Sequence, residues 1–287
     1  MKNVIAINSA PAKHWVGNAF HVSSMFSYQS HGETLSPFLL LDHAAPKVFE
    51  PSANKRGVGE HPHRGFETVT IVYQGEVEHR DSTGAGGVIG TGDVQWMTAG
   101  SGIMHEEFLS TDFTQTGGEM EMAQLWVNLP AKHKMTTPKY QDIQASQIPT
   151  LQLGDNAGQL RLIAGDYQDS HGPASTFSPL QVMDTRINAG KKIELELNQG
   201  WTGAVVVLSG TVEINSERLV RERQMAVLST EGTGVSIEAN NDAKLLILSG
   251  EPLNEPIVGY GPFVMNSREE IEATLRDFKN GDFGSIS

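Results

Sequence analysis

The chain has 287 residues, 38% of them hydrophobic and 19% charged, which excludes a disordered or fibrous protein and also a single small domain. Its 21 basic and 34 acidic side chains give a formal net charge of −13, and no basic stripe is present to bind nucleic acid directly. Cysteine is absent, which excludes disulfides, iron–sulfur clusters and thiolate metal sites, so histidine and carboxylate side chains are the strong metal ligands available.

The N-terminal segment, Met1 to Ile7, has one positive charge and an apolar run shorter than that of a signal peptide. No stretch of the sequence approaches the roughly 20 apolar residues that cross a membrane as a helix. We therefore expect a cytoplasmic protein that binds neither membranes nor nucleic acid.

Short apolar segments separated by glycines follow one another up to about residue 265, a pattern typical of all-β barrels and sandwiches. The segment Phe66–Gln74 is rich in Thr, Val, Ile and Tyr and predicts a strand. Alternate side chains of a strand share a face. Continuing the alternation from His61 and His63 predicts that the odd-numbered residues, including Glu67, line a barrel interior, provided that no bulge shifts the register at Gly65.

Two short motifs, His61-Pro62-His63 and His105-Glu106-Glu107, each carry two metal-ligating side chains at positions i and i+2. In an extended strand such pairs lie side by side on one face, with Glu106 on the opposite face and solvated. Three histidines and a carboxylate placed in this way are improbable by chance. The motifs therefore predict a mononuclear metal site with nitrogen and oxygen ligands.

The donor set also indicates the kind of metal site. A structural zinc site usually closes a tetrahedron of four protein ligands and often includes cysteine. Three imidazoles and a carboxylate at a barrel mouth suit a six-coordinate ion with two open positions. This favours iron(II) and is compatible with manganese, nickel, copper and zinc.

The other candidate residues have simpler interpretations. We expect the remaining histidines to be hydrogen-bonded structural residues: His14, His21, His31, His43, His79, His133 and His171. Core or pocket-wall positions are expected for Phe66, Trp96, Met97 and Trp126, and a surface ion pair for Arg64.

An internal repeat predicts two related domains, because Val72–Glu78 resembles Val207–Glu213, 135 positions later. Lysines and prolines interrupt the strand pattern between Pro130 and Pro149, which indicates a linker. Nine of the ten histidines lie at or before residue 133, so the second half lacks a comparable histidine set. We expect a metal-binding domain over 1–135, a second β domain without metal ligands over 150–257, and a tail over 258–287.

The C-terminal tail carries a helix signal. Ser267-Arg268-Glu269-Glu270 fits a capping box, and Ile271, Leu275 and Phe278 form an apolar stripe at helical spacing that ends near Gly281. Since the stripe has no basic face beside it, we expect a short helix that covers a β domain rather than one that binds a membrane.

Taken together, the motifs resemble those of the cupin superfamily. In their detailed residue pattern they resemble those of the pirin family within it. The matching strings are His61–Val69, Gly92–Gly100, Gly102–His105 and Gln124–Pro130. The resemblance extends to Tyr260–Asn266 and the final helix, and so covers nearly the whole chain. It implies two tandem cupin-type β-barrels, a bicupin, followed by a short C-terminal helix.

The pirin resemblance implies four metal ligands: His61, His63, His105 and Glu107. The ordinary cupin pattern would nominate Glu67 as the carboxylate, and we expect Glu107 because it shares a strand face with His105. The second motif has Thr98 where cupins usually have proline, and extra residues before His105. These departures weaken the match to the general cupin motif but agree with the pirin motif.

Two functions follow from the resemblance. The first is a quercetin 2,3-dioxygenase activity, in which a flavonol or another enolic or catecholic aromatic is opened by O2 at the metal. Glu107 would then act as both ligand and base, taking the proton of the substrate hydroxyl. The alternative is a non-enzymatic, iron-dependent regulator that acts through a protein partner, either a transcription factor or a metabolic enzyme.

Overall fold

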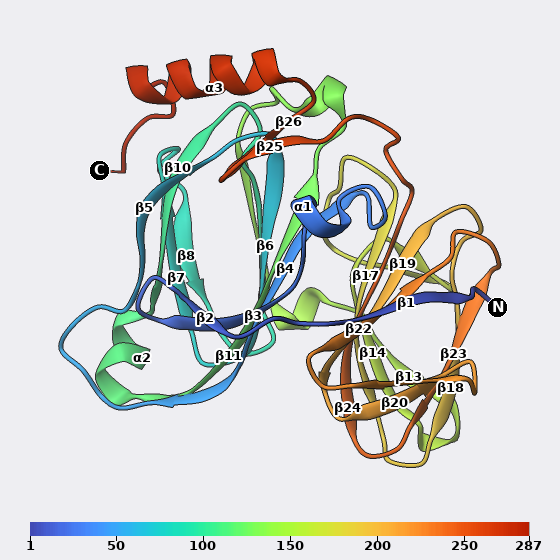
Figure 1. Ribbon diagram of the computed structural model, residues 1–287. Helices are drawn as coiled ribbons and strands as arrows, with labels where there is room; N and C mark the ends of the chain where they lie inside the picture. The colour runs from blue at the N-terminus through green and yellow to red at the C-terminus, as the bar shows by residue number, and fades with distance from the viewer. Residues whose placement is uncertain (287) are drawn as a thin grey trace. The chain divides into compact units, whose positions relative to one another are not determined.

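The computed structural model describes residues 1–286 and consists mainly of strands (Figure 1). The backbone forms two compact units. The histidine-rich unit comprises Ala12–Gly32, Phe38–Ala145 and Asn254–Ser287, and the histidine-poor unit comprises Met1–Pro11, Glu33–Pro37 and Ser146–Leu253. The predicted all-β fold with two β domains and a short C-terminal helix is confirmed. Among the described residues, no helix is long and apolar enough to cross a membrane.

The units differ from the expected contiguous domains at both ends of the chain. Strand β1 (Val4–Ser9) pairs with β22 (Gln224–Leu228) and so joins the histidine-poor unit, while residues from Asn254 onward join the histidine-rich one. Pairing with β1 covers a sheet edge that β22 would otherwise expose. The buried Lys2, just before β1, anchors this strand, because its Nζ donates to three carbonyl oxygens of the same unit.

The histidine-rich unit is a barrel of two antiparallel sheets. The larger has the strand order β12-β9-β6-β11-β4-β3-β2 and the smaller the order β5-β10-β7-β8. The larger sheet consists of β2 (His14–Val16), β3 (Phe20–Ser27), β4 (Phe38–Phe49), β6 (Phe66–Gln74), β9 (Val94–Thr98), β11 (Gly118–Asn128) and β12 (Lys139–Ile143). The smaller consists of β5 (Gly57–His63), β7 (Val77–Asp81), β8 (Gly86–Ile89) and β10 (Ile103–Leu109). One apolar cluster takes side chains from both sheets, among them Phe20, Val72, Val77 and Leu109.

The turn between β5 and β6 reverses the face expected for β6. These strands belong to different sheets, and Gly65 between them has φ +88°, a conformation that favours glycine. The even-numbered face of β6 meets the interior: Thr70 donates to Glu107, and Val72 packs in the apolar cluster. The prediction that the odd-numbered face, with Glu67, lines this interior is therefore wrong, because the required continuity fails at Gly65.

The C-terminal tail completes the histidine-rich unit. Strands β25 (Val258–Tyr260) and β26 (Phe263–Met265) form a hairpin, and α3 (Arg268–Asn280), red in Figure 1, follows it. The predicted capping box is confirmed, with Ser267 as the N-cap, and Gly281 ends the helix in the left-handed conformation. Ile271 packs against Phe263 and Phe283, so the helix covers the β25–β26 hairpin. The unit also contains α1 (Tyr28–His31), α2 (Thr111–Thr116) and the 3₁₀ turn Ala131–His133.

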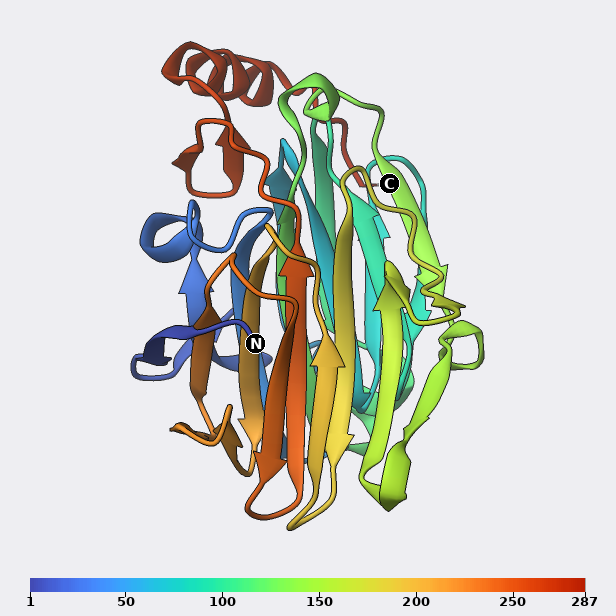
Figure 2. The same cartoon turned by 90° about the vertical axis from the view of Figure 1, so that its right-hand side faces the viewer.

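The histidine-poor unit repeats the two-sheet plan, and the strands of its larger sheet run side by side in Figure 2. That sheet consists of β1, β13 (Thr150–Leu153), β14 (Gly158–Ala164), β17 (Leu180–Ile187), β19 (Thr202–Ser209), β22 and β24 (Ala243–Gly250). The smaller consists of β18 (Lys192–Glu196), β20 (Thr211–Ile214), β21 (Arg218–Arg221) and β23 (Gly234–Ala239). A hairpin of β15 (Asp166–Tyr167) and β16 (Ser170–His171) and the 3₁₀ turn Gly154–Asn156 complete it, and a further turn, Ala145–Gln147, lies at the boundary. Its core is a large cluster of aliphatic side chains from both sheets, including Val205, Ile214, Ile237 and Leu245.

We predict that Gly65→Ala destabilises the protein more than Gly84→Ala does. Both glycines have positive φ, so each substitution introduces backbone strain of about 1–3 kcal/mol. A Cβ at Gly65 would also lie 2.0 Å from the carbonyl oxygen of Val264, whereas a Cβ at Gly84 meets nothing within 4 Å. Thermal unfolding followed by circular dichroism measures the difference. Equal decreases in Tm would show that the β5–β6 turn tolerates a side chain.

Candidate metal centre

The pairing of β5 with β10 brings the two sequence motifs together. The strands run antiparallel with His105 opposite His61 and Ile103 opposite His63. Strand β5 is an edge strand of its sheet, so Pro62, which lacks an N–H, is tolerated within it. The register shifts between His105 and Glu107, where β5 has one residue more than β10.

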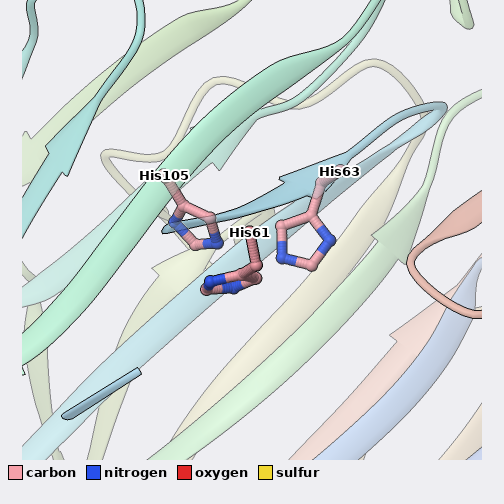
Figure 3. A group of neighbouring side chains, drawn as sticks. All are labelled: His61, His63 and His105. Atoms are coloured by element: carbon pink, nitrogen blue, oxygen red, sulfur yellow. The ribbon is translucent and has the colours of Figure 1, made fainter. Parts of the chain in front are cut away.

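Three imidazole rings converge at this point (Figure 3). Their centroids lie 4.2 Å apart for His61 and His105, 4.7 Å for His63 and His105, and 5.0 Å for His61 and His63. One nitrogen of each ring lies within 4.8 Å of the other two. Nitrogens at this spacing can bind one ion after small side-chain movements, because zinc, for example, lies 2.0–2.1 Å from a histidine nitrogen.

The hydrogen bonding of the three rings leaves nitrogen lone pairs available. His61 Nδ1 donates to the carbonyl oxygen of Gly59 at 2.8 Å, so its Nε2 carries a lone pair. His63 Nδ1 and His105 Nε2 are buried and have no hydrogen-bond partner among residues 1–286. A buried nitrogen without a partner costs free energy, and a bound metal ion would remove that cost. The cluster therefore fits a metal ion.

Burial also sets the protonation state of the cluster. It lowers the pKa of His63 and of His105 well below the usual histidine value, and the neighbouring histidines lower both further. Both rings are consequently neutral at physiological pH. Neutral imidazole is the form that binds metals, so no proton has to leave these two rings when an ion enters.

Glu107 lies beside the cluster in a buried position, where each carboxylate oxygen accepts one hydrogen bond. Its Oε1 accepts from Thr70 Oγ1 at 3.1 Å and its Oε2 accepts from Gln124 Nε2 at 2.8 Å. One carboxylate oxygen of Glu107 and one nitrogen each of His79 and His105 lie within 4.8 Å of one another. These three residues form a second group, which shares His105 with the three-histidine cluster. Glu106, between His105 and Glu107, is half-buried, in keeping with an opposite-facing side chain.

Glu67, the alternative carboxylate, lies outside both groups. It accepts a hydrogen bond from Thr98 Oγ1 at 2.8 Å on the face of β6 opposite Thr70. Burial raises the pKa of Glu67 to about 7, although the hydrogen bond from Thr98 acts in the opposite direction. The carboxylate near the histidines is therefore that of Glu107.

The second group contains a histidine that sequence reasoning assigned to structural hydrogen bonding alone. His79, on β7, is fully buried and hydrogen-bonded to Asp81 at 3.0 Å, and its Nδ1 lies 3.4 Å from His105 Nδ1. Its spacing from Asp81 is again i and i+2, the signal used for the other pairs. Because β7 pairs with β10, His79 lies opposite Glu107.

The aromatic side chains beside the cluster form one of its walls. Phe66 stacks on Trp126 at 4.3 Å, and the ring of His63 lies edge-on to both, at 5.1 and 5.3 Å. Trp96 and Met97 are fully buried core residues. The predicted core or pocket-wall positions of these four residues are therefore confirmed.

Arg64 pairs with the C-terminal helix. Its guanidinium donates to Asp277 at 2.7 Å and to the carbonyl oxygen of Ser101 at 2.7 Å, and lies over the ring of Phe283. The ion pair expected for this residue is confirmed. The prediction that Arg64 lies at the surface is wrong, because the C-terminal tail covers the side chain and leaves it only 4% exposed.

A small cavity adjoins the cluster. His61, Glu107, Asp42 and Gln124 supply its polar lining, and the apolar lining consists of Val16, Phe20, Val22, Val58 and Met122. The space open to the centre of a water-sized molecule is about 30 Å³. This holds water or a very small ligand but is well below the volume of ordinary aromatic ligand sites.

Known proteins resemble the chain over nearly its full length. A family model described as Pirin matches residues 19–127, and one described as Pirin C-terminal cupin domain matches residues 182–284. A Pseudomonas aeruginosa protein named "Putative quercetin 2,3-dioxygenase" is 59% identical over 283 residues, which is 99% of both chains. Pirin-like protein 2 of Arabidopsis thaliana is 34% identical over 264 residues, 89% of this chain and 78% of that protein.

A solved structure agrees with these matches. The crystal structure of a quercetin 2,3-dioxygenase from Acinetobacter baumannii has a TM-score of 0.98 with this chain at 54% identity, and covers 100% of both chains. The resemblance and the bicupin fold inferred from the motifs are thereby confirmed.

We predict that Glu107→Gln weakens metal binding and that Glu67→Gln does not. The first change removes the buried carboxylate beside the imidazoles, and its cost should exceed the roughly 10–100-fold that outer contacts of a metal site typically contribute. Titration of the metal-free variants with iron(II) under anaerobic conditions measures both affinities. Loss of binding in Glu67→Gln alone would assign the carboxylate ligand to Glu67.

We also predict that Glu67 makes stability depend on pH. The pKa of Glu67 is raised from the ordinary glutamate value of 4.5 to about 7 in the folded protein. Between these two pH values the folded state therefore binds a proton that the unfolded state has lost. The contribution of protonated Glu67 to stability is complete below about pH 4.5 and is lost as the pH rises through about 7. Relative to wild type, Glu67→Gln should therefore gain up to about 3 kcal/mol between pH 4.5 and pH 8. Urea unfolding at both pH values measures this, and parallel pH profiles would contradict it.

Proposed function

The chain belongs to the pirin family, and from this membership and the geometry of the histidine cluster we propose that it is a metal-dependent dioxygenase of the quercetin 2,3-dioxygenase type. The proposed substrate is a flavonol or another enolic or catecholic aromatic. The proposed metal ligands are the three clustered histidines, His61, His63 and His105, together with Glu107, which lies at metal-ligand spacing from His105. The observation that carries the proposal is the convergence of three imidazoles, two of them buried and neutral, beside a buried carboxylate and a cavity.

Iron(II) is the proposed metal. Two lone pairs in the cluster lack partners among residues 1–286, and imidazole nitrogen with carboxylate oxygen is a donor set that iron(II) shares with manganese, nickel, copper and zinc. The bound ion would supply a Lewis acid for the substrate hydroxyl and a coordination position for O2. The protein's contribution is to hold the ligands in place and to exclude most of the solvent.

Glu107 is proposed as both ligand and base. Each of its oxygens accepts one hydrogen bond, from Thr70 and from Gln124, and each keeps a further lone pair. In the proposed step the O–H bond of the substrate's 3-hydroxyl breaks, the proton moves to a Glu107 oxygen, and the substrate becomes an electron-rich anion. The two hydrogen bonds keep the carboxylate oriented while the proton moves.

The substrate has to enlarge the cavity. A flavonol is much larger than a space of about 30 Å³, so side chains of the wall must move outward. Val16 and Phe20 come from β2 and the start of β3, and β2 is the edge strand of its sheet, paired with β3. Since an edge hairpin has few partners to lose, this wall is the part of the barrel proposed to open.

The relatives support the substrate class. The Pseudomonas aeruginosa and Acinetobacter baumannii proteins, at 59% and 54% identity, both carry quercetin 2,3-dioxygenase in their names. Their names support a small aromatic substrate for this chain. Quercetin itself is proposed as the probe compound, and other flat catechols are proposed as competitors for the same cavity.

We predict stoichiometric iron(II) binding and O2 uptake in the presence of quercetin. The test uses the full chain purified without a histidine tag, elemental analysis of the metal as isolated, anaerobic reconstitution with iron(II), and an oxygen electrode. Absence of stoichiometric metal would overturn the proposal as a whole. Stoichiometric metal without O2 uptake on quercetin or any other catechol would overturn the enzymatic function and leave the iron-dependent regulator.

The role of Glu107 requires its own control. Glu107→Gln should reduce O2 uptake by about 10²–10⁴-fold if the carboxylate is the base, measured at an iron concentration that saturates the variant. Glu106→Gln, a neutralisation of the adjacent half-buried residue, should retain wild-type turnover. Equal turnover in iron-saturated Glu107→Gln and wild type would show that another group takes the proton.

A further inference from the structure

Behind His105 lie two buried side chains, His79 and Asp81, that the proposed reaction does not use. His79 Nε2 lies 3.0 Å from Asp81 Oδ2, and both side chains are fully buried. His79 Nδ1 lies 3.4 Å from His105 Nδ1. The strand register supports this order, because β7 pairs with β10 and places Asp81 opposite His105.

The hydrogen bonds of Asp81 set the tautomer of His79. Asp81 Oδ1 accepts from the backbone N–H of Thr83 at 2.8 Å and from its hydroxyl at 2.6 Å. An ionised carboxylate accepts hydrogen bonds and donates none. The short contact at Oδ2 therefore requires a proton on His79 Nε2, and a neutral His79 then has its lone pair on Nδ1.

Two donors face that lone pair. Gln95 Nε2 lies 3.2 Å from His79 Nδ1, and its amide is oriented by Tyr140, whose hydroxyl donates to Gln95 Oε1. Tyr140 also stacks on the ring of His79 at 5.0 Å. The second donor is His105 Nδ1, which can approach a lone pair on His79 only if it carries a proton. His105 then has its own lone pair on Nε2, the buried nitrogen without a partner among residues 1–286.

We propose that Asp81 and His79 are positioning residues that hold His105 in the Nδ1–H tautomer and aim its Nε2 at the metal. This inference rests on the metal site of the proposed function. A carboxylate or other acceptor behind a metal-binding histidine fixes ring orientation and tautomer in many metal sites. Here the acceptor is itself a histidine, so Asp81 acts on the metal-binding His105 indirectly, through its hydrogen bond to His79.

The competing role for His79 is direct ligation, since it forms a group with His105 and Glu107. Its hydrogen bonds argue against that role. Nε2 is directed at Asp81, and Nδ1 faces the Gln95 amide and His105. Ligation by His79 would require one of these contacts to break, whereas His105 Nε2 has none to lose.

The tautomer is tested in the wild-type protein without metal. Nitrogen-15 NMR of the histidine side chains should show His105 with a proton on Nδ1 and none on Nε2. This measurement needs neither a metal nor turnover, so it tests the positioning role even if the proposed dioxygenase activity is absent. A proton on His105 Nε2 would overturn the inference.

The energetic role is tested with Asp81→Asn. Losing the carboxylate should lower iron(II) affinity by about 10–100-fold and mix the two His105 tautomers, while the number of histidine ligands in the X-ray absorption spectrum stays at the wild-type value. Unchanged affinity, measured on a variant whose circular dichroism matches wild type, would overturn the positioning role. The matched control is Asp166→Asn, which changes an exposed Asp–His pair with His171 in the histidine-poor unit and should leave affinity unchanged.

His79→Gln separates positioning from ligation. The glutamine side-chain oxygen can still accept a hydrogen bond from His105 Nδ1–H, so the variant should keep the wild-type number of histidine ligands and bind iron(II) more weakly than wild type. One histidine fewer in the iron-bound spectrum of His79→Gln would identify His79 as a ligand and overturn the proposal.

Discussion

The antiparallel register between β5 and β10 is the constraint on which the site depends. It sets His61 opposite His105, and the edge position of β5 allows the proline that separates His61 from His63. Side chains of a strand alternate between two faces, so a slip of one residue in this pairing would send one motif out of the barrel. The extra residue in β5 before the pairing of Glu107 with Val58 is part of the same register and sets where the carboxylate lies.

Much of this could be predicted from the sequence, because the decisive distances are local. Residues two apart in a strand share a face independently of the rest of the fold. The pairs around His61 and His105 could therefore be recognised as ligand pairs from the sequence. Ser267 and Glu270 are likewise local, and the capping box they predicted begins α3. The internal repeat and the glycine-punctuated apolar segments were sufficient for an all-β fold with two units.

The failures come from features that local spacing does not contain. The face of β6 depended on the backbone conformation of Gly65, and with φ +88° the chain turned into another sheet, taking Glu67 away from the histidines. His79 carried the same i and i+2 signal as the other pairs, but its relation to His105 depends on the pairing of β7 with β10. Arg64 was expected at the surface, but a tail more than 200 residues later in the chain covers it.

That tail contact ties the first histidine motif to a segment about 200 residues further along the chain. Arg64 is hydrogen-bonded to Pro262, Val264 and Asp277, and Lys134 Nζ donates to the carbonyl oxygens of Gly65 and Val264. Val264 lies in β26 and Asp277 in α3, while His63 directly precedes Arg64. A substitution that loosens the tail would therefore act on the position of His63 without changing any side chain of the histidine cluster.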